Sequence, residues 1–210
     1  MAEVANAGAD RQEISRSKLL LVEGENERRF FVALLRRLEL SDAVQVLNYG
    51  GKTQLRPLLS TLHLVPGYSD LTALGVTRDA DESFASAFQS ICNSLGNAGL
   101  GVPDQTRAPT SATPSVSVFV LPDCSSPGML ETLCLSAMQD DPAMPCVEQY
   151  FQCLEESASI PSKNPDKARA HAFLASRSKP ELRVGEAAEA GYWQLDSPVY
   201  YPLKSFLLAL

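Results

Sequence analysis

The stretch ALGVTRDADESFASAF, residues 73–88, places an apolar run directly before two aspartates that are separated by one residue. The run that begins at Ala73 is typical of a buried strand, and the residues from Glu82 onward predict a helix. Asp79 and Asp81 therefore lie where a strand ends and a helix begins. Two interpretations are open at this point: Asp81 caps the helix, or both aspartates are ligands of a metal ion.

The same alternation of a short apolar strand and an amphipathic helix occurs four times along the chain. This alternation predicts an α/β fold of the Rossmann-like kind, with a mostly parallel four-stranded sheet flanked by helices. The expected strands cover residues 18–24, 43–51, 71–81 and 115–123, and the expected helices cover residues 25–40, 52–65, 82–95 and 127–138.

Three regions are expected along the chain. Residues 1–16 are polar and predict a flexible N-terminal tail, and residues 17–140 predict the α/β core. Residues 141–210 predict a C-terminal helical extension packed on the same domain, with helices over residues 143–158 and 166–176.

The composition is that of a soluble globular protein. The chain has 210 residues, of which 45% are hydrophobic and 20% charged, enough for one good core. No apolar run reaches the roughly 18 residues that a membrane helix needs, and the N-terminus lacks a signal-peptide pattern. We therefore expect a cytoplasmic protein without membrane contact. The five cysteines are irregularly spaced and only two histidines are present, which argues against a structural zinc site and against a disulfide framework.

The charges are unevenly distributed along the chain. The net charge is −7, and residues 79–162 contain eleven acids and one base. A protein that coats DNA would be basic throughout, so this class is excluded. Contact with nucleic acid through the basic ends of the chain stays open, provided that a divalent cation offsets the acidic middle.

Acids follow several of the predicted strands at the point where each strand ends. Glu23 follows the first strand, Asp79 and Asp81 follow the third, and Asp123 follows the fourth. The carboxyl ends of parallel strands meet at one edge of the sheet, where ligands bind. Carboxylates gathered there repel one another, and a divalent cation relieves that repulsion. Oxygen ligands without histidine or cysteine indicate Mg²⁺ or Mn²⁺, with Asp123 and Glu131 as weaker candidate ligands than the other three.

The second strand ends in Gly50-Gly51-Lys52. Flexible glycines, a cation and a following helix are typical of a phosphate-binding turn, although the P-loop spacing is absent. A plain turn explains the same residues equally well. We carry both interpretations forward, with Gly50, Gly51 and Lys52 as candidate substrate-phosphate ligands.

The stretches LLLVEGENERRFF (residues 19–31) and LGVTRDADES (residues 74–83) together resemble the Toprim domain of topoisomerases, primases, OLD-type nucleases and small ribonucleases. Three further stretches resemble a group of standalone bacterial Toprim-like proteins of unknown function. They are YGGKTQL, LPDCSSPGMLETL and GYWQLDSPVYYPLKSF. The Toprim pattern has a glutamate after the first strand and D-x-D after the third, which correspond to Glu23 and to Asp79 and Asp81.

The resemblance implies a metal-dependent nuclease, or a related phosphotransfer protein, acting on nucleic acid. Glu23, Asp79 and Asp81 would be its catalytic and metal-binding residues, and Mg²⁺ or Mn²⁺ its cofactor. The chain departs from many Toprim domains in having Glu82-Ser83-Phe84 after the D-x-D. It also has no topoisomerase tyrosine domain and no zinc-binding primase domain, so neither strand passage nor primer synthesis is expected. The alternative is a non-catalytic Toprim-like module that binds a nucleotide, nucleic acid or protein partner in a bacterial defence or repair assembly.

Overall fold

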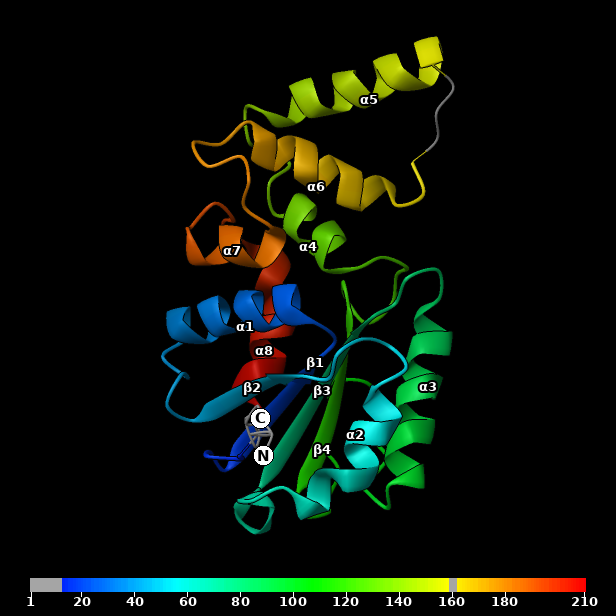
Figure 1. The fold of residues 1–210 in the computed structure, drawn as a ribbon, viewed down its shortest axis with the longest axis vertical. Helices are drawn as coiled ribbons and strands as arrows, with labels where there is room; N and C mark the ends of the chain where they lie inside the picture. Colours follow the sequence, from blue (N-terminus) through cyan, green and yellow to red (C-terminus); the bar gives the residue numbers. More distant parts are fainter. Residues whose placement is uncertain (1–12, 159–161) are drawn as a thin grey trace, which may run out of the picture.

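The centre of the fold is a four-stranded sheet in which every strand pair is parallel. The computed structural model describes residues 13–158 and 162–210 of the chain. The strand order is β2-β1-β3-β4 (Figure 1), which confirms the predicted α/β fold with a parallel four-stranded sheet. The strands are β1 (Lys18–Val22), β2 (Val44–Asn48), β3 (Ala73–Asp79) and β4 (Ser115–Leu121).

Helices cover both faces of the sheet, which explains why the strands read as continuous apolar runs. Successive residues of β1 point to opposite faces, so Leu19 and Leu21 enter one core while Leu20 and Val22 enter the other. The first core is closed by α2 (Leu55–Thr61) and α3 (Phe84–Asn97). The second core is closed mainly by α1 (Glu25–Arg37), α4 (Leu130–Ser136), α7 (Val184–Glu189) and α8 (Tyr201–Leu208).

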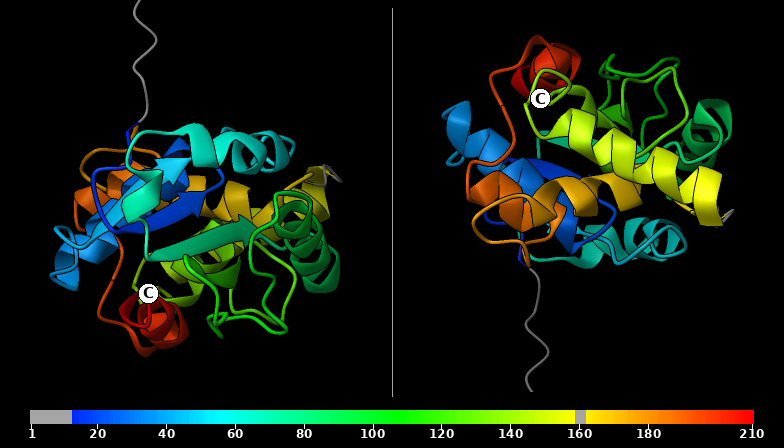
Figure 2. Two further views of the ribbon diagram at one scale, coloured as in Figure 1. Left: turned by 90° about the horizontal axis from the view of Figure 1, so that it is seen from below. Right: turned by 90° about the horizontal axis from the view of Figure 1, so that it is seen from above.

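The described residues from 141 to 210 form four α-helices that are joined by turns and loops. In Figure 1, α4, α6 (Pro165–Ala175) and α5 (Met144–Ala158) are stacked beyond the carboxyl ends of the strands. Figure 2, seen from above, shows α5 and α6 lying across that end of the sheet. The described residues also form three short 3-10 helices, at Leu62–Leu64, Tyr68–Asp70 and Pro198–Tyr200. No helix in the described part of the chain has the length and apolar character needed to cross a bilayer.

The packing of α7 on α1 depends on a glycine. A Cβ atom at Gly185 would lie 2.3 Å from the carbonyl oxygen of Asn26 and 2.9 Å from the Cβ of Arg29. Only glycine allows the two helices to approach this closely. This contact fastens the C-terminal helices to the first helix of the α/β core.

The described structure begins at residue 13, inside the tail that the sequence predicts for residues 1–16. Residues 1–12 of the predicted tail lie outside the described residues. Ile14, however, is 4% exposed, and its backbone N–H donates to the carbonyl of Pro66 over 2.9 Å. The Ser15 N–H donates to Oε1 of Gln45 over 2.7 Å. Residues 13–16 are therefore packed against the fold, because an apolar side chain at position 14 has a core to enter.

Candidate functional site

Glu23 follows the last residue of β1, at the carboxyl edge of the sheet. Its backbone is held by the next turn, since the N–H of Gly51 donates to the Glu23 carbonyl over 2.8 Å. The Oε2 atom of Glu23 is buried and has no hydrogen-bond partner within the described structure. Burial raises the pKa of Glu23, and the nearby Lys52 and Arg78 only partly offset this rise.

Asp79 is the last residue of β3, in register with Leu121 of β4. Its Oδ1 atom accepts a hydrogen bond from the backbone N–H of Leu130 over 3.1 Å, which ties the strand end to the start of α4. Burial raises the pKa of Asp79 well above its usual range, and the charges of Glu27 and Glu23 raise it further. The folded protein therefore disfavours the ionised form of Asp79.

Asp81 has a backbone conformation that few residues other than glycine adopt. Its φ angle is +51°, and it exchanges two backbone hydrogen bonds of 2.8 Å with Gly128. Its carboxylate forms an ion pair with Lys52. The helix-capping interpretation of Asp81 is wrong, because the N-cap of α3 is Ser83, whose Oγ accepts from the N–H of Ser86 over 3.2 Å.

Two further glutamates lie near Asp79, and each contributes to the rise of its pKa. Glu27 is in the first turn of α1, and burial followed by the charge of Glu131 raises its own pKa. Glu131, in the first turn of α4, is 5% exposed and lies 3.9 Å from the Nζ of Lys167. We refer to Glu23, Glu27, Asp79, Asp81 and Glu131 as the acidic cluster.

Sequence reasoning missed Glu27. It lies four residues after Glu23, one helical turn along, and this spacing was the available signal. An acid in the first turn of a helix usually reflects the helix dipole alone, so the signal is weak. Glu27 lies near Asp79 because α1 packs against the sheet.

Asp123 does not join the acidic cluster. Its Oδ1 atom accepts from the N–H groups of Ser125 and Ser126 over 2.9 and 2.7 Å, and its Oδ2 atom accepts from the hydroxyl of Ser126 over 2.8 Å. Although burial acts in the opposite direction, these hydrogen bonds lower the pKa of Asp123. The structure thus uses this aspartate to hold the turn after β4, and the weaker assignment of Asp123 as a metal ligand is not supported by its contacts.

The Gly50-Gly51-Lys52 turn also differs from the predicted phosphate-binding turn. Gly50 and Gly51 have φ angles of +81° and +104°, as the flexible turn requires. The N–H of Gly51, however, is bonded to Glu23, and α2 begins only at Leu55. The turn therefore supports Glu23 and places Lys52 beside Asp81, and the N–H of Gly51 is not free to bind a phosphate.

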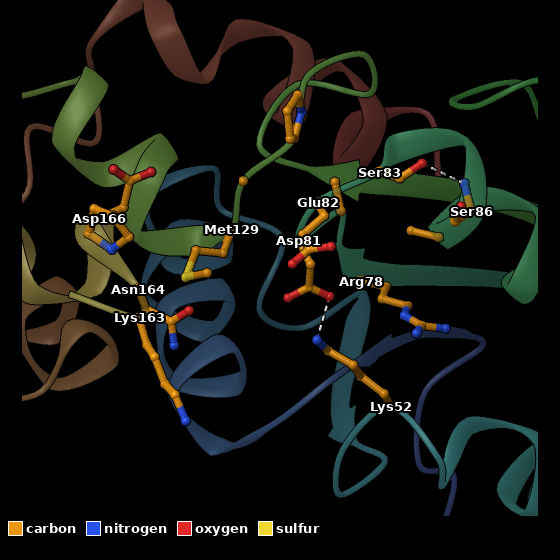
Figure 3. A pocket seen from close by; sticks show the side chains of 15 residues that line it. Lys52, Arg78, Asp81, Glu82, Ser83, Ser86, Met129, Lys163, Asn164 and Asp166 are labelled. Atoms are coloured by element: carbon orange, nitrogen blue, oxygen red, sulfur yellow. Dashed lines mark hydrogen bonds and ion pairs between the residues drawn. The ribbon is translucent and has the colours of Figure 1, made fainter. Parts of the chain in front are cut away.

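Two clefts flank the acidic cluster. The first cleft has a volume of about 730 Å³ and is lined on one side by Lys52, Arg78 and Asp81 and on the other by Lys163 and Asp166 (Figure 3). The second cleft has a volume of about 430 Å³ and is lined by Glu23 and Glu27 together with basic residues that include Lys167. Each cleft thus combines acids of the cluster with cations, an arrangement suited to a phosphate group and its counter-ion.

The cluster fits a hard divalent cation by its chemistry. Its donors are all carboxylate oxygens, and the buried Oε2 of Glu23 has no other partner in the described structure. In the positions seen here, no group of three or more His, Cys, Asp or Glu side chains within residues 13–158 and 162–210 could hold a metal ion. Binding would require side chains to move, and Asp81 would exchange its ion pair with Lys52 for the cation.

Two solved structures of the C-terminal region of the OLD protein from Xanthomonas campestris pv. campestris resemble this fold. The structure phased with mercury has a TM-score of 0.51 and 15% sequence identity, with 93% of this chain and 94% of that chain covered. The structure phased with iodine has a TM-score of 0.41 and 14% identity, with 92% and 97% covered. At this identity, the first likeness shows the fold alone.

No curated protein matches the sequence of this chain. A family profile, in contrast, matches residues 17–210, which include the whole sheet, the acidic cluster and the C-terminal helices. The chain therefore belongs to the family described as protein of unknown function (DUF3226).

Proposed function

We propose that this chain has a Toprim-type fold and is a Mg²⁺- or Mn²⁺-dependent phosphodiesterase acting on nucleic acid. The order of the motif residues supports the Toprim assignment, with Glu23 after β1 and Asp79 and Asp81 at the end of β3. The likeness in fold to the C-terminal region of an OLD protein is consistent with it.

The observation that carries this proposal is the set of carboxylates around Asp79. Burial and mutual repulsion raise the pKa values of Glu23, Glu27 and Asp79. In a purely structural site, such carboxylates would be paired with cations or replaced by uncharged side chains, because an unpaired buried charge lowers stability. Clusters of this kind are characteristic of functional sites, where they bind metal ions or transfer protons.

Asp79 and Asp81 would hold the cation, with Glu27 as a further ligand. A bound Mg²⁺ or Mn²⁺ supplies charge stabilisation to a phosphate oxygen and to the leaving oxygen. Burial raises the pKa of Glu23, which favours uptake of a proton by its carboxylate, and Glu23 would serve as general acid and base. Lys52 and Arg78, which line the first cleft, would bind the non-bridging phosphate oxygens.

A second candidate function is a binding module without catalysis. The ion pair between Lys52 and Asp81 favours it, because the pair neutralises one of the motif aspartates without a metal. Such a module would bind a nucleotide, a nucleic acid or a protein partner and release no product.

Turnover with metal distinguishes the two functions. The chelator-treated protein is incubated with labelled DNA and RNA in Mn²⁺ or Mg²⁺, and products are separated on denaturing gels. The enzyme should release metal-dependent products, and Asp79→Asn should abolish them. Asp123→Asn is the matched control, since Asp123 lies at the same sheet edge outside the cluster. A complete absence of products with every substrate, while metal still raises the melting temperature, would support the binding module instead.

A further inference from the structure

A groove runs between α2 and α3 on the face of the sheet that these helices cover. Its volume is about 790 Å³. It shares Lys52 and Ser86 with the first cleft, so it adjoins the cleft that Asp81 of the acidic cluster lines. Figure 1 shows the two helices side by side, with their axes on the same side of β3. The lining residues are Lys52, Thr53, Arg56, Ala85, Ser86, Gln89, Ser90, Asn93, Ser94 and Asn97.

The charge of this groove is opposite to that of the chain. The ten lining residues, all within the described part of the chain, include Lys52 and Arg56 and no acid. The whole chain carries 25 acids and a net charge of −7, yet α3 has no charged residue along its 14 positions. Arg78 adds a third cation behind the groove, where its Nη1 atom donates to the Ser90 hydroxyl over 2.8 Å. Lys52 is paired with Asp81, so Arg56 and Arg78 supply most of the positive charge that an anion would meet in the groove, whose own lining residues include no acid.

Arg29 and Arg37, two of the basic residues of α1, are already paired with acids. Arg29 lies 3.5 Å from Glu186 and 3.4 Å from Glu189 of α7. Arg37 forms an ion pair with Asp196. These pairs join α1 to the C-terminal segment and reduce the positive potential of its surface.

The uncharged side chains of the groove are hydroxyls and amides on one face of α3. Ser86, Gln89, Ser90, Asn93 and Asn97 recur at helical spacing. Together with Lys and Arg, these residue types make most protein contacts to phosphate and sugar. No aromatic ring lines the groove in the described structure, so it lacks the stacking platform on which unpaired bases are usually held. Its chemistry fits the sugar–phosphate backbone and not the bases.

We propose that the groove between α2 and α3 binds the sugar–phosphate backbone of a nucleic-acid strand and directs one of its phosphates to the acidic cluster. This inference rests on the proposed function, because it takes a phosphodiester as the group that enters the cluster. A helix of 14 residues is about 21 Å long, which matches about six nucleotides at 3.4 Å each. Recognition through the backbone makes binding independent of sequence and sensitive to salt.

The test measures binding in chelator, where no metal-dependent cleavage occurs. The full chain is titrated into fluorescently labelled single-stranded DNA, duplex DNA and RNA of mixed sequence, and anisotropy is recorded between about 50 and 200 mM salt. Gln89→Glu adds one negative charge to the groove and keeps the side-chain shape. Gln149→Glu makes the same change at an exposed position of α5 and is the matched control.

Gln89→Glu should weaken binding about tenfold, since a carboxylate beside a phosphate adds repulsion of that order. Gln149→Glu should bind as the parent does. Arg56→Gln should reduce the slope of log K against log salt by about 0.7 for a single strand or 0.9 for a duplex. Arg36→Gln, at an exposed position of α1, should reduce it less. The substrate arms show whether the backbone is that of DNA or RNA.

Three results would overturn the inference: no binding by the parent protein, parent-like binding by Gln89→Glu and Arg56→Gln, or equal losses in the two control variants. Its failure is distinguishable from failure of the proposed function. If metal produces neither cleavage nor thermal stabilisation but the groove variants alone lose affinity, the phosphodiesterase proposal is wrong and the groove assignment holds.

Discussion

Replacing Asp79 by asparagine should stabilise the metal-free protein at neutral pH. Burial, followed by the charges of Glu27 and Glu23, raises the pKa of Asp79, so the folded protein is destabilised by its ionised form. Asparagine removes the charge and keeps the shape. Its side-chain oxygen can still accept the hydrogen bond that the Leu130 N–H donates to Oδ1 over 3.1 Å.

The stabilisation by Asp79→Asn should increase as the pH rises. The folded-state pKa of Asp79 lies above its ordinary value of 3.8, so between these two values the folded state holds a proton that the unfolded state has lost. The stability that the protonated Asp79 side chain contributes is fully present below its pKa in the unfolded state and is lost as the pH rises through its pKa in the folded state. The advantage of Asp79→Asn should therefore be small near pH 4 and should grow toward neutral pH.

The magnitude follows from the relief of repulsion at a functional site, which is typically about 0.5–2 kcal/mol. For a chain of this size each kcal/mol changes the melting temperature by about 2–4 °C, so the expected increase at neutral pH is about 1–8 °C. Asp79→Ala should gain less, or lose stability, because the Leu130 N–H then lacks its partner at a cost of about 1–3 kcal/mol.

The assay is thermal unfolding in chelator from pH 4 to 8, repeated with Mn²⁺. The parent should gain about 2.7 kcal/mol at about a hundred times the Kd for the metal, whereas Asp79→Asn should gain little. Equal destabilisation of Asp79→Asn at both ends of the pH range would refute the reasoning, because it would mean that the carboxylate is a favourable structural group. An unchanged response to Mn²⁺ would refute the assignment of Asp79 as a metal ligand.

Three other predictions follow from particular contacts. Glu27→Gln should weaken Mn²⁺ binding about 10–100-fold in a thermal titration. Glu155→Gln, on the exposed face of α5, should leave the affinity for Mn²⁺ unchanged. Equal affinities of the two variants would show that Glu27 is not part of the site. Asp123→Ala should lower the free energy of unfolding in urea by about 1 kcal/mol, because the hydrogen bonds of the turn are lost. The thermal stabilisation by Mn²⁺ should remain, and its loss would show that Asp123 is a metal ligand. Gly185→Ala should lower the free energy of unfolding by about 1–3 kcal/mol in the same urea assay, because its Cβ would lie 2.3 Å from the Asn26 carbonyl oxygen. An unchanged stability would show that α7 shifts freely on α1.

The secondary structure and the general location of the site were predictable from the sequence. The apolar runs before Glu23 and Asp79 are local patterns, and a strand buried on both faces needs no more than such a run. Alternation with helices then requires parallel strands, which brings their carboxyl ends to one edge. On this basis, residues as distant as Glu23 and Asp79 could be placed near each other. The metal dependence and the catalysis inferred from that edge stay predictions.

Only the tertiary structure decided which side chains at that edge meet. Glu27 and Glu131 enter the cluster because α1 and α4 pack with their first turns toward Asp79, and no local pattern specifies that direction. Asp123 ends its strand in the same way as Asp79, yet its carboxylate bonds to the neighbouring serines. The Lys52 side chain meets Asp81 across the sheet edge. Sequence periodicity determines which face of an element is buried, but distances between remote side chains depend on how the elements pack together.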